Sequence, residues 1–175
     1  PSVSAPAKIR LPWLLILMFT SSITGSIINN YENSFAAIPL LVSVIPMLMD
    51  TGGNCGSQSS TLIIRGLALS QIQFRDIFKV VFKEFRISLI VGSVLAVSTG
   101  IRIMIQYGDP SLALVIALSL VGTVVSSKMI GCMLPLLASR VHLDPALMAS
   151  PLITTLVDIF SILIYFNIAT HLFNL

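Results

Sequence analysis

The sequence predicts an all-α integral membrane protein with five transmembrane helices, and three observations lead to this fold class. The mean hydropathy of the chain is +0.98. In the full sequence, 55% of the residues are hydrophobic and only 10% are charged. The apolar residues also gather in runs of about 20, the length that a helix needs to cross a hydrocarbon core of about 30 Å. Helices of this length satisfy their own backbone hydrogen bonds in lipid.

Five spans follow one another in a single transmembrane domain that covers residues 1–175. The apolar runs place them at approximately 11–28, 35–69, 85–107, 112–137 and 145–173. The first run is too long for the apolar core of a cleavable signal peptide, so we interpret it as a retained helix. A polar turn at Asn29–Asn33 is expected to end it. Gly108–Pro110 separates the third span from the fourth, and Arg140–Asp144 separates the fourth from the fifth.

The second span contains a run of glycines and small polar residues, Asp50–Thr61, which are poor helix formers. Without this run, the apolar piece 35–49 would reach only about 22 Å. We therefore expect a helix that is broken by the run at membrane depth, where unwound carbonyls could line a water-filled path. An equally weighted interpretation is that the glycines allow close packing of helices. These glycines are Gly52, Gly53 and Gly56.

The charge pattern predicts how the chain lies in the membrane. The net charge is +3. Basic residues flank the spans, in the N-terminal segment, around the second connection and in the fourth. This positive-inside bias predicts a multi-pass protein of the cell (inner) membrane with a cytoplasmic N-terminus and an external C-terminus. Because this bias accounts for the basic residues, we expect no nucleic-acid partner. The amphipathic stretch Gln71–Phe85 is expected to be a surface helix that runs into the third span.

Asp158 lies near the middle of the fifth apolar run, where a charge costs at least about 2.5–3.5 kcal/mol. Thr154 and Ser150 precede it by one and two helical turns, so their oxygens share its face. Intramembrane acids usually mark ion or proton pathways. We therefore interpret these three residues as a candidate metal site, and the alternative is that Asp158 is a protonated packing residue.

Two long strings resemble the signature of the MgtE family of magnesium channels. They are Pro46–Gln58 (PMLMDTGGNCGSQ) and Asp144–Asp158 (DPALMASPLITTLVD), and the resemblance extends over about residues 11–173. It implies a homodimer whose pore lies at the subunit interface and is lined mainly by the second and fifth spans. On this basis Asp158 is the pore aspartate, with Thr154 and Ser150 along the passage. Further pore-lining candidates are Asp50, Gly52, Gly53, Asn54 and Gln58.

The chain departs from the family pattern in three respects. Family members usually carry a cytoplasmic N-terminal domain and CBS domains that sense magnesium, and we expect no such sensor in this chain. Ser150 stands where relatives can carry an amide. Lys128 lies deep in the fourth span, where a cation would repel Mg²⁺, and we expect it to snorkel or to pair with Glu84.

The chemistry of the predicted site favours transport of a hydrated divalent cation, with no enzymatic activity. Mg²⁺ keeps several of its waters and uses one or two carboxylates, which the two Asp158 side chains of a dimer would supply. Mn²⁺, Co²⁺ and Ca²⁺ are further candidate ions, whereas the absence of nearby His or Cys disfavours soft metals. The expected partners are a second copy, membrane lipid and Mg²⁺.

Three rival functions follow from the same residues. A proton-coupled divalent cation carrier would exchange protons at Asp158. An intramembrane aspartyl protease would pair Asp158 with Asp50, but the expected Gly-x-Gly-Asp pattern is absent. A non-transporting dimerisation scaffold would need no carboxylate in the middle of a span.

Overall fold

The fold is an all-helical bundle, as the sequence predicts. The computed structural model describes residues 4–35, 38–142 and 150–174. Its elements in chain order are α1 (Ser4–Phe35), α2 (Pro39–Ser43), α3 (Ile45–Ala68), the 3₁₀ turn η1 (Phe74–Asp76), α4 (Ile77–Tyr107), α5 (Pro110–Arg140) and α6 (Ser150–Phe173). No strand occurs within the described ranges.

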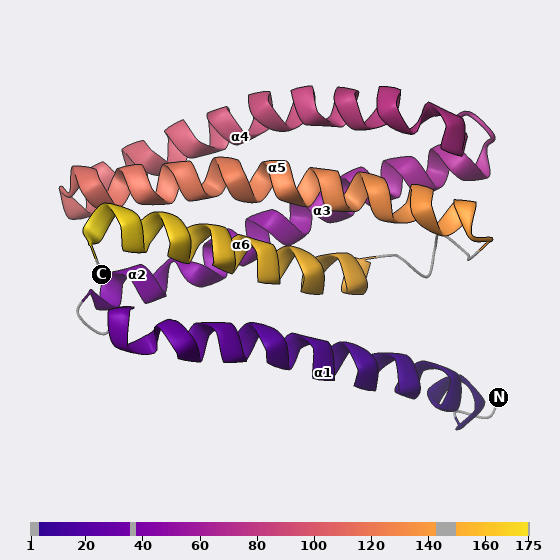
Figure 1. The fold of residues 1–175 in the computed structure, drawn as a ribbon, viewed down its shortest axis with the longest axis horizontal. Helices are drawn as coiled ribbons and strands as arrows, with labels where there is room; N and C mark the ends of the chain where they lie inside the picture. Colours follow the sequence, from indigo (N-terminus) through magenta and orange to yellow (C-terminus); the bar gives the residue numbers. More distant parts are fainter. Residues whose placement is uncertain (1–3, 36–37, 143–149, 175) are drawn as a thin grey trace.

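The helices run roughly parallel to one long axis, with α4 at one edge of the bundle and α1 at the other (Figure 1). Helix α5 is the centre of the packing, because it contacts α3, α4 and α6. Helix α3 runs obliquely across α6 and α5 and contacts both, whereas α1 packs mainly on α6 (Figure 1). The polar helix α3 is therefore enclosed on two sides by apolar helices.

Four of the described helices are long and apolar enough to cross a membrane. Their spans are Leu11–Tyr31, Phe74–Tyr107, Pro110–Arg140 and Pro151–Phe173. The second predicted span contains α2 and α3. Neither qualifies by this measure, because α2 is short and the run Asp50–Thr61 lowers the hydropathy of α3.

The expected break in the second span is wrong in its position. Asp50–Thr61 is helical throughout and lies inside α3. The chain interrupts its helix earlier, at Val44, between α2 and α3. Pro46 lies in the first turn of α3, where backbone N–H groups have no partner within the helix. The N–H that proline lacks is therefore not needed there, and Pro46 favours the start of a new helix. The glycines stay helical because an unwound backbone in lipid leaves polar groups unsatisfied, whereas a helix satisfies them and packs closely.

The other predicted boundaries need smaller corrections. The polar turn expected at Asn29–Asn33 is instead part of α1, which continues to Phe35. The amphipathic stretch is helical from Ile77 onward and is continuous with the third span in α4, as expected. The predicted start of the fifth span, at residue 145, lies outside the described residues, and α6 begins at Ser150.

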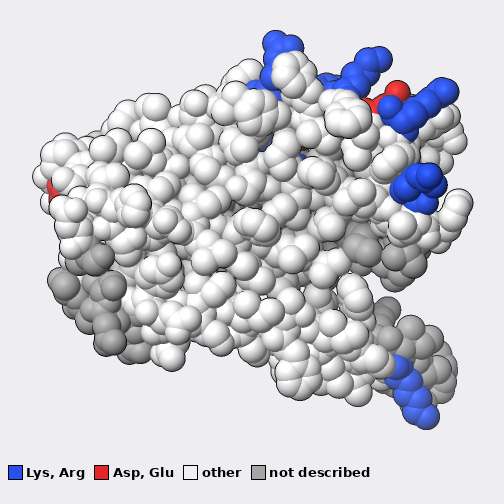
Figure 2. Space-filling view, viewed as in Figure 1, with Lys and Arg blue, Asp and Glu red and all other residues white. Residues whose placement is uncertain are grey.

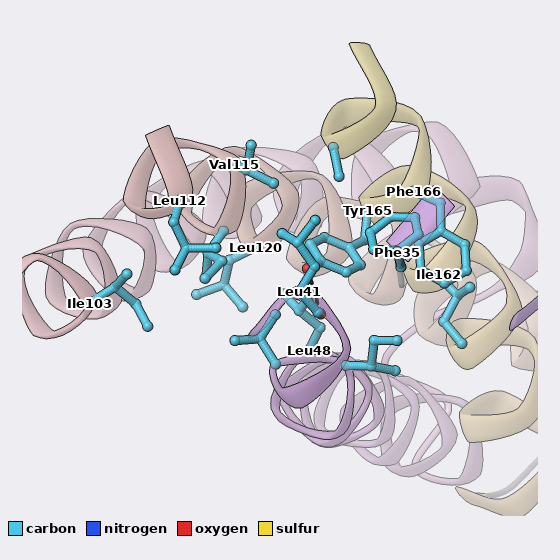
Figure 3. Close-up of a cluster of buried hydrophobic side chains, with 14 of the residues drawn as sticks. Phe35, Leu41, Leu48, Ile103, Leu112, Val115, Leu120, Ile162, Tyr165 and Phe166 are labelled. Atoms are coloured by element: carbon cyan, nitrogen blue, oxygen red, sulfur yellow. Dashed lines mark hydrogen bonds between the residues drawn. The ribbon is translucent and has the colours of Figure 1, made fainter. Parts of the chain in front are cut away.

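An aromatic and aliphatic cluster holds α6 against α2, α3 and the end of α1 (Figure 3). The rings of Phe35 and Phe166 lie 4.5 Å apart, and both are buried. The hydroxyl of the fully buried Tyr165 donates a hydrogen bond of 2.6 Å to the carbonyl oxygen of Leu41. This cluster fixes the register between α3 and α6, the two helices that carry the predicted site.

Lys and Arg side chains gather at one end of the molecule (Figure 2). The C-terminal ends of α3 and α5 and the N-terminal end of α4 lie together there (Figure 1). Arg65 is in the last turn of α3, and Arg140 is in the last turn of α5. The bundle therefore has a basic end, as the positive-inside pattern requires of one membrane face.

A candidate ion-binding groove between α3 and α6

A groove of about 290 Å³ runs between α3 and α6 and carries two carboxylates. It is lined by Met49, Asp50, Gly53, Asn54 and Ser57 of α3 and by Thr154 and Asp158 of α6. The α3 residues recur at helical spacing, so they form one face, and the two α6 residues are one turn apart. The continuous helical path of α3 is what aligns these side chains along the groove.

The oxygens of the groove are hard donors of the kind that Mg²⁺ and Ca²⁺ prefer. The exposed Asp50 carboxylate accepts a hydrogen bond of 3.2 Å from Nδ2 of Asn54. Asp158 is half-buried, and no hydrogen bond to its carboxylate forms among the described residues. Thr154 donates to the carbonyl oxygen of Pro151 at 3.0 Å. Across the described ranges, no three His, Cys, Asp or Glu side chains converge on one point.

Glycines bring α3 close enough to α6 to form this groove. A Cβ atom on Gly53 would lie 3.0 Å from Cγ2 of Thr154. On the opposite side of α3, a Cβ on Gly52 would lie 2.8 Å from Cγ2 of Thr123 and from Cγ1 of Val157. The close-packing interpretation of these glycines therefore agrees with the structure. The same run supplies a packing face and a polar face.

The structure brings five of the predicted site residues together in the groove. They are Asp158, Thr154, Asp50, Gly53 and Asn54. Gly52 packs against α5 and α6 instead, and Oε1 of Gln58 accepts a hydrogen bond of 3.1 Å from Lys128. Ser150 begins α6, but its side chain lies outside the described residues.

Met49 and Ser57 also line the groove, although neither was among the residues predicted for the site. Ser57 follows Asp50 by seven residues and Asn54 by three, so a continuous helix places all three on one face. The spacing of these residues can be read from the sequence. It was not used to predict the site because the helix was expected to be broken in this segment.

Lys128 lies behind α3 in a buried network that neutralises its charge. Its Nζ atom is 3.9 Å from Oε2 of Glu84 and 3.3 Å from Oγ of Ser59. Ser59 in turn donates a hydrogen bond of 2.7 Å to Glu84. The expected pairing of Lys128 with Glu84 is confirmed, and the network joins α3, α4 and α5 on the side away from the groove.

The family model MgtE, described as a divalent cation transporter, matches residues 45–168. The magnesium transporter MgtE of Bacillus subtilis (strain 168) is 40% identical over 92% of this chain and 36% of the relative. Its counterpart in Thermus thermophilus is 39% identical over 91% of this chain and 35% of the relative. The magnesium transporter MgtE of Enterococcus faecalis is 34% identical over 94% of this chain and 36% of the relative. The chain thus spans about a third of the length of these curated relatives.

Proposed function

Because this chain belongs to the MgtE family of divalent cation transporters, we propose that it forms the Mg²⁺-conducting membrane part of a homodimeric channel. The family consists of transporters, so the aspartyl-protease hypothesis is excluded. The observation that carries the proposal is the groove in which Asp158 and Asp50 meet amide and hydroxyl oxygens.

The ion in this proposal is a hydrated Mg²⁺ that contacts few protein oxygens directly. Mg²⁺ dehydrates reluctantly and keeps several waters, so one or two carboxylates suffice. Asp158 is half-buried, and none of the described residues bonds its carboxylate, which leaves the carboxylate available to the ion. Thr154, one turn away, and Ser150, two turns away, extend the path along α6. On α3, Asp50 and Asn54 form the opposite wall.

Two copies of the chain complete the pore. One chain supplies one Asp158, and a two-fold axis beside the groove would set two such carboxylates across a single passage. At an effective dielectric constant near 20, the attraction between a carboxylate and a monovalent cation 4 Å away is roughly 4 kcal/mol before desolvation is subtracted. The attraction of a divalent cation is about twice as large. The site thereby favours divalent over monovalent cations. The basic end faces the cytoplasm in this arrangement, which places the N-terminus inside and the C-terminus outside.

The decisive experiment measures Mg²⁺ flux into liposomes that contain the wild-type chain or the Asp158→Asn variant. The substitution keeps the size of the side chain and removes one formal charge per subunit, so flux should fall by orders of magnitude. Asp50→Asn, at the exposed wall of the groove, should have a smaller effect. If folded Asp158→Asn protein carries Mg²⁺ at the wild-type rate, the ion path lies elsewhere. A rate that follows an imposed pH gradient would instead indicate the proton-coupled carrier.

Cross-linking tests the dimer separately. Cys55 and Cys132 are buried, so they contribute little background labelling. A cysteine at Ser57, on the groove side of α3, should cross-link two subunits in lipid. A cysteine at Ser98, which is exposed on α4, should not. A dimer that forms through Ser98 and never through Ser57 would contradict the shared-groove arrangement.

A further inference from the structure

Three basic side chains lie on one face of α4 close to its N-terminal end. Lys79, Lys83 and Arg86 are spaced by four and three residues, so they point in nearly the same direction. All three are exposed. Together with Phe82, Ile87 and Ile90 they line a shallow depression of about 250 Å³ on the surface of the helix. This depression is therefore basic at one end and apolar at the other.

The charges of this face have no acidic partner within the described part of the chain. The ion pair among the described residues joins Lys128 to Glu84, so it includes none of the three basic residues on this face. A larger crevice on the other side of Lys79 and Lys83 also contains Asp76 and Glu84. The outer face is thus the side of α4 on which positive charge is not balanced by a described carboxylate.

An exposed apolar stripe continues along α4 from the cations toward the centre of the span. It consists of Ile90, Val94, Val97 and Ile101, at spacings of four, three and four residues, and each is more than half exposed. The stripe is about 17 Å long at 1.5 Å per residue, close to half of a hydrocarbon core of about 30 Å. Helix α4 packs on α5 and η1 and lies at the edge of the bundle (Figure 1). This face therefore matches one leaflet in depth.

We propose that this α4 face binds an anionic phospholipid, with its phosphate at Lys79, Lys83 and Arg86 and an acyl chain along Ile90–Ile101. A soluble phosphate or an acidic peptide would match only the cations, whereas an amphiphile matches the cations and the stripe. The positive-inside bias accounts for basic residues at this end of the bundle. It does not account for three of them aligned above an exposed apolar stripe. Basic residues near the surface of the cytoplasmic leaflet attract anionic lipids by about 1 kcal/mol per Lys or Arg.

Native mass spectrometry of the purified chain tests the site, with phosphatidylglycerol and phosphatidylcholine supplied in equal amounts. The wild type should retain phosphatidylglycerol preferentially. The test variant replaces all three cations by glutamine (Lys79→Gln, Lys83→Gln, Arg86→Gln). Because each basic residue near a membrane surface contributes roughly fivefold, the affinity of this variant for phosphatidylglycerol should fall about 100-fold.

A second triple variant is the matched control. It makes the same change of charge at the same end of the bundle but outside the α4 face (Arg65→Gln, Arg75→Gln, Arg140→Gln). Its affinity for phosphatidylglycerol should stay within about fivefold of the wild type. If the two variants lost the same affinity for phosphatidylglycerol, the proposal would be overturned, because the lipid would then be attracted to the basic end in general. Thermal unfolding in phosphatidylcholine alone checks that both variants are folded.

Competition with glycerol phosphate separates a lipid from a free anion. This probe carries the headgroup charge without an acyl chain, so a large excess should leave the bound phosphatidylglycerol in place. The double variant Val94→Ser, Val97→Ser should weaken phosphatidylglycerol binding by removing part of the apolar stripe. If glycerol phosphate displaces the lipid at comparable concentration, or the serine variant binds it as tightly as the wild type, the site is an anion site and the proposal fails.

Discussion

Gly131→Ala should destabilise the protein because it forces α3 and α5 apart where the backbones of Gly131 and Gly56 lie close together. A Cβ atom on Gly131 would overlap the carbonyl oxygen of Gly56 and would lie 2.9 Å and 3.0 Å from that residue's carbonyl carbon and Cα. These are backbone atoms, so no side chain can turn aside to make room. The helices must separate, and α3 has little room to move toward α6, because a Cβ on Gly53 would lie only 3.0 Å from Cγ2 of Thr154.

The expected cost is that of overpacking a core, about 1–3 kcal/mol. For a chain of this size, 1 kcal/mol corresponds to roughly 2–4 °C in the unfolding temperature, so a decrease of roughly 2–12 °C is expected. The assay is thermal unfolding of the purified protein in detergent, followed by circular dichroism. Mg²⁺ flux should fall as well, since a displaced α3 changes the wall of the groove.

Gly100→Ala is the matched control on α4. Its Cβ atom would lie 3.8 Å from Cβ of Ala117 and 4.0 Å from the carbonyl oxygen of Ala113, which are ordinary contacts. Alanine also has the higher helix propensity, by about 1 kcal/mol, so the unfolding temperature should stay the same or rise. The reasoning is wrong if Gly131→Ala unfolds at the wild-type temperature. It is also wrong if the unfolding temperatures of the two variants fall equally, because the close approach of α3 and α5 would then not determine stability.

Two further predictions concern buried polar groups. Lys128→Met should cost about 3–5 kcal/mol because it leaves the Glu84 carboxylate buried without its cation, and adding Glu84→Gln should restore most of the loss in a double-mutant cycle of chemical unfolding. Equal instability of the single and double variants would show that the charges are not coupled. Tyr165→Phe should cost about 1–3 kcal/mol, measured in the same way, because the carbonyl oxygen of Leu41 loses its donor. A neutral effect would mean that another donor replaces the hydroxyl.

Hydropathy and helical spacing were sufficient to predict the membrane class, the long helices and the alignment of Thr154 with Asp158. The path of α3 could not be predicted from its composition, because glycine and serine are poor helix formers in isolation. Tertiary packing overrides that preference here, since Gly52 and Gly56 let the helical α3 pack closely on both α5 and α6. The partner of Gln58 was equally hidden, because Lys128 lies 70 residues away in sequence and only the fold brings the two together.

The two faces of α3 explain why its sequence is polar and rich in glycine at once. The groove face carries Asp50, Asn54 and Ser57, which would be costly against lipid. The opposite face carries Gly52 and Gly56, whose missing side chains let α5 and α6 cover the helix backbone closely. A bulkier packing face would hold the neighbouring helices away and would open polar backbone to the bilayer. The glycines are therefore needed for the polar face to persist at membrane depth, and a bulkier residue at Gly52 or Gly56 should lower both stability and flux.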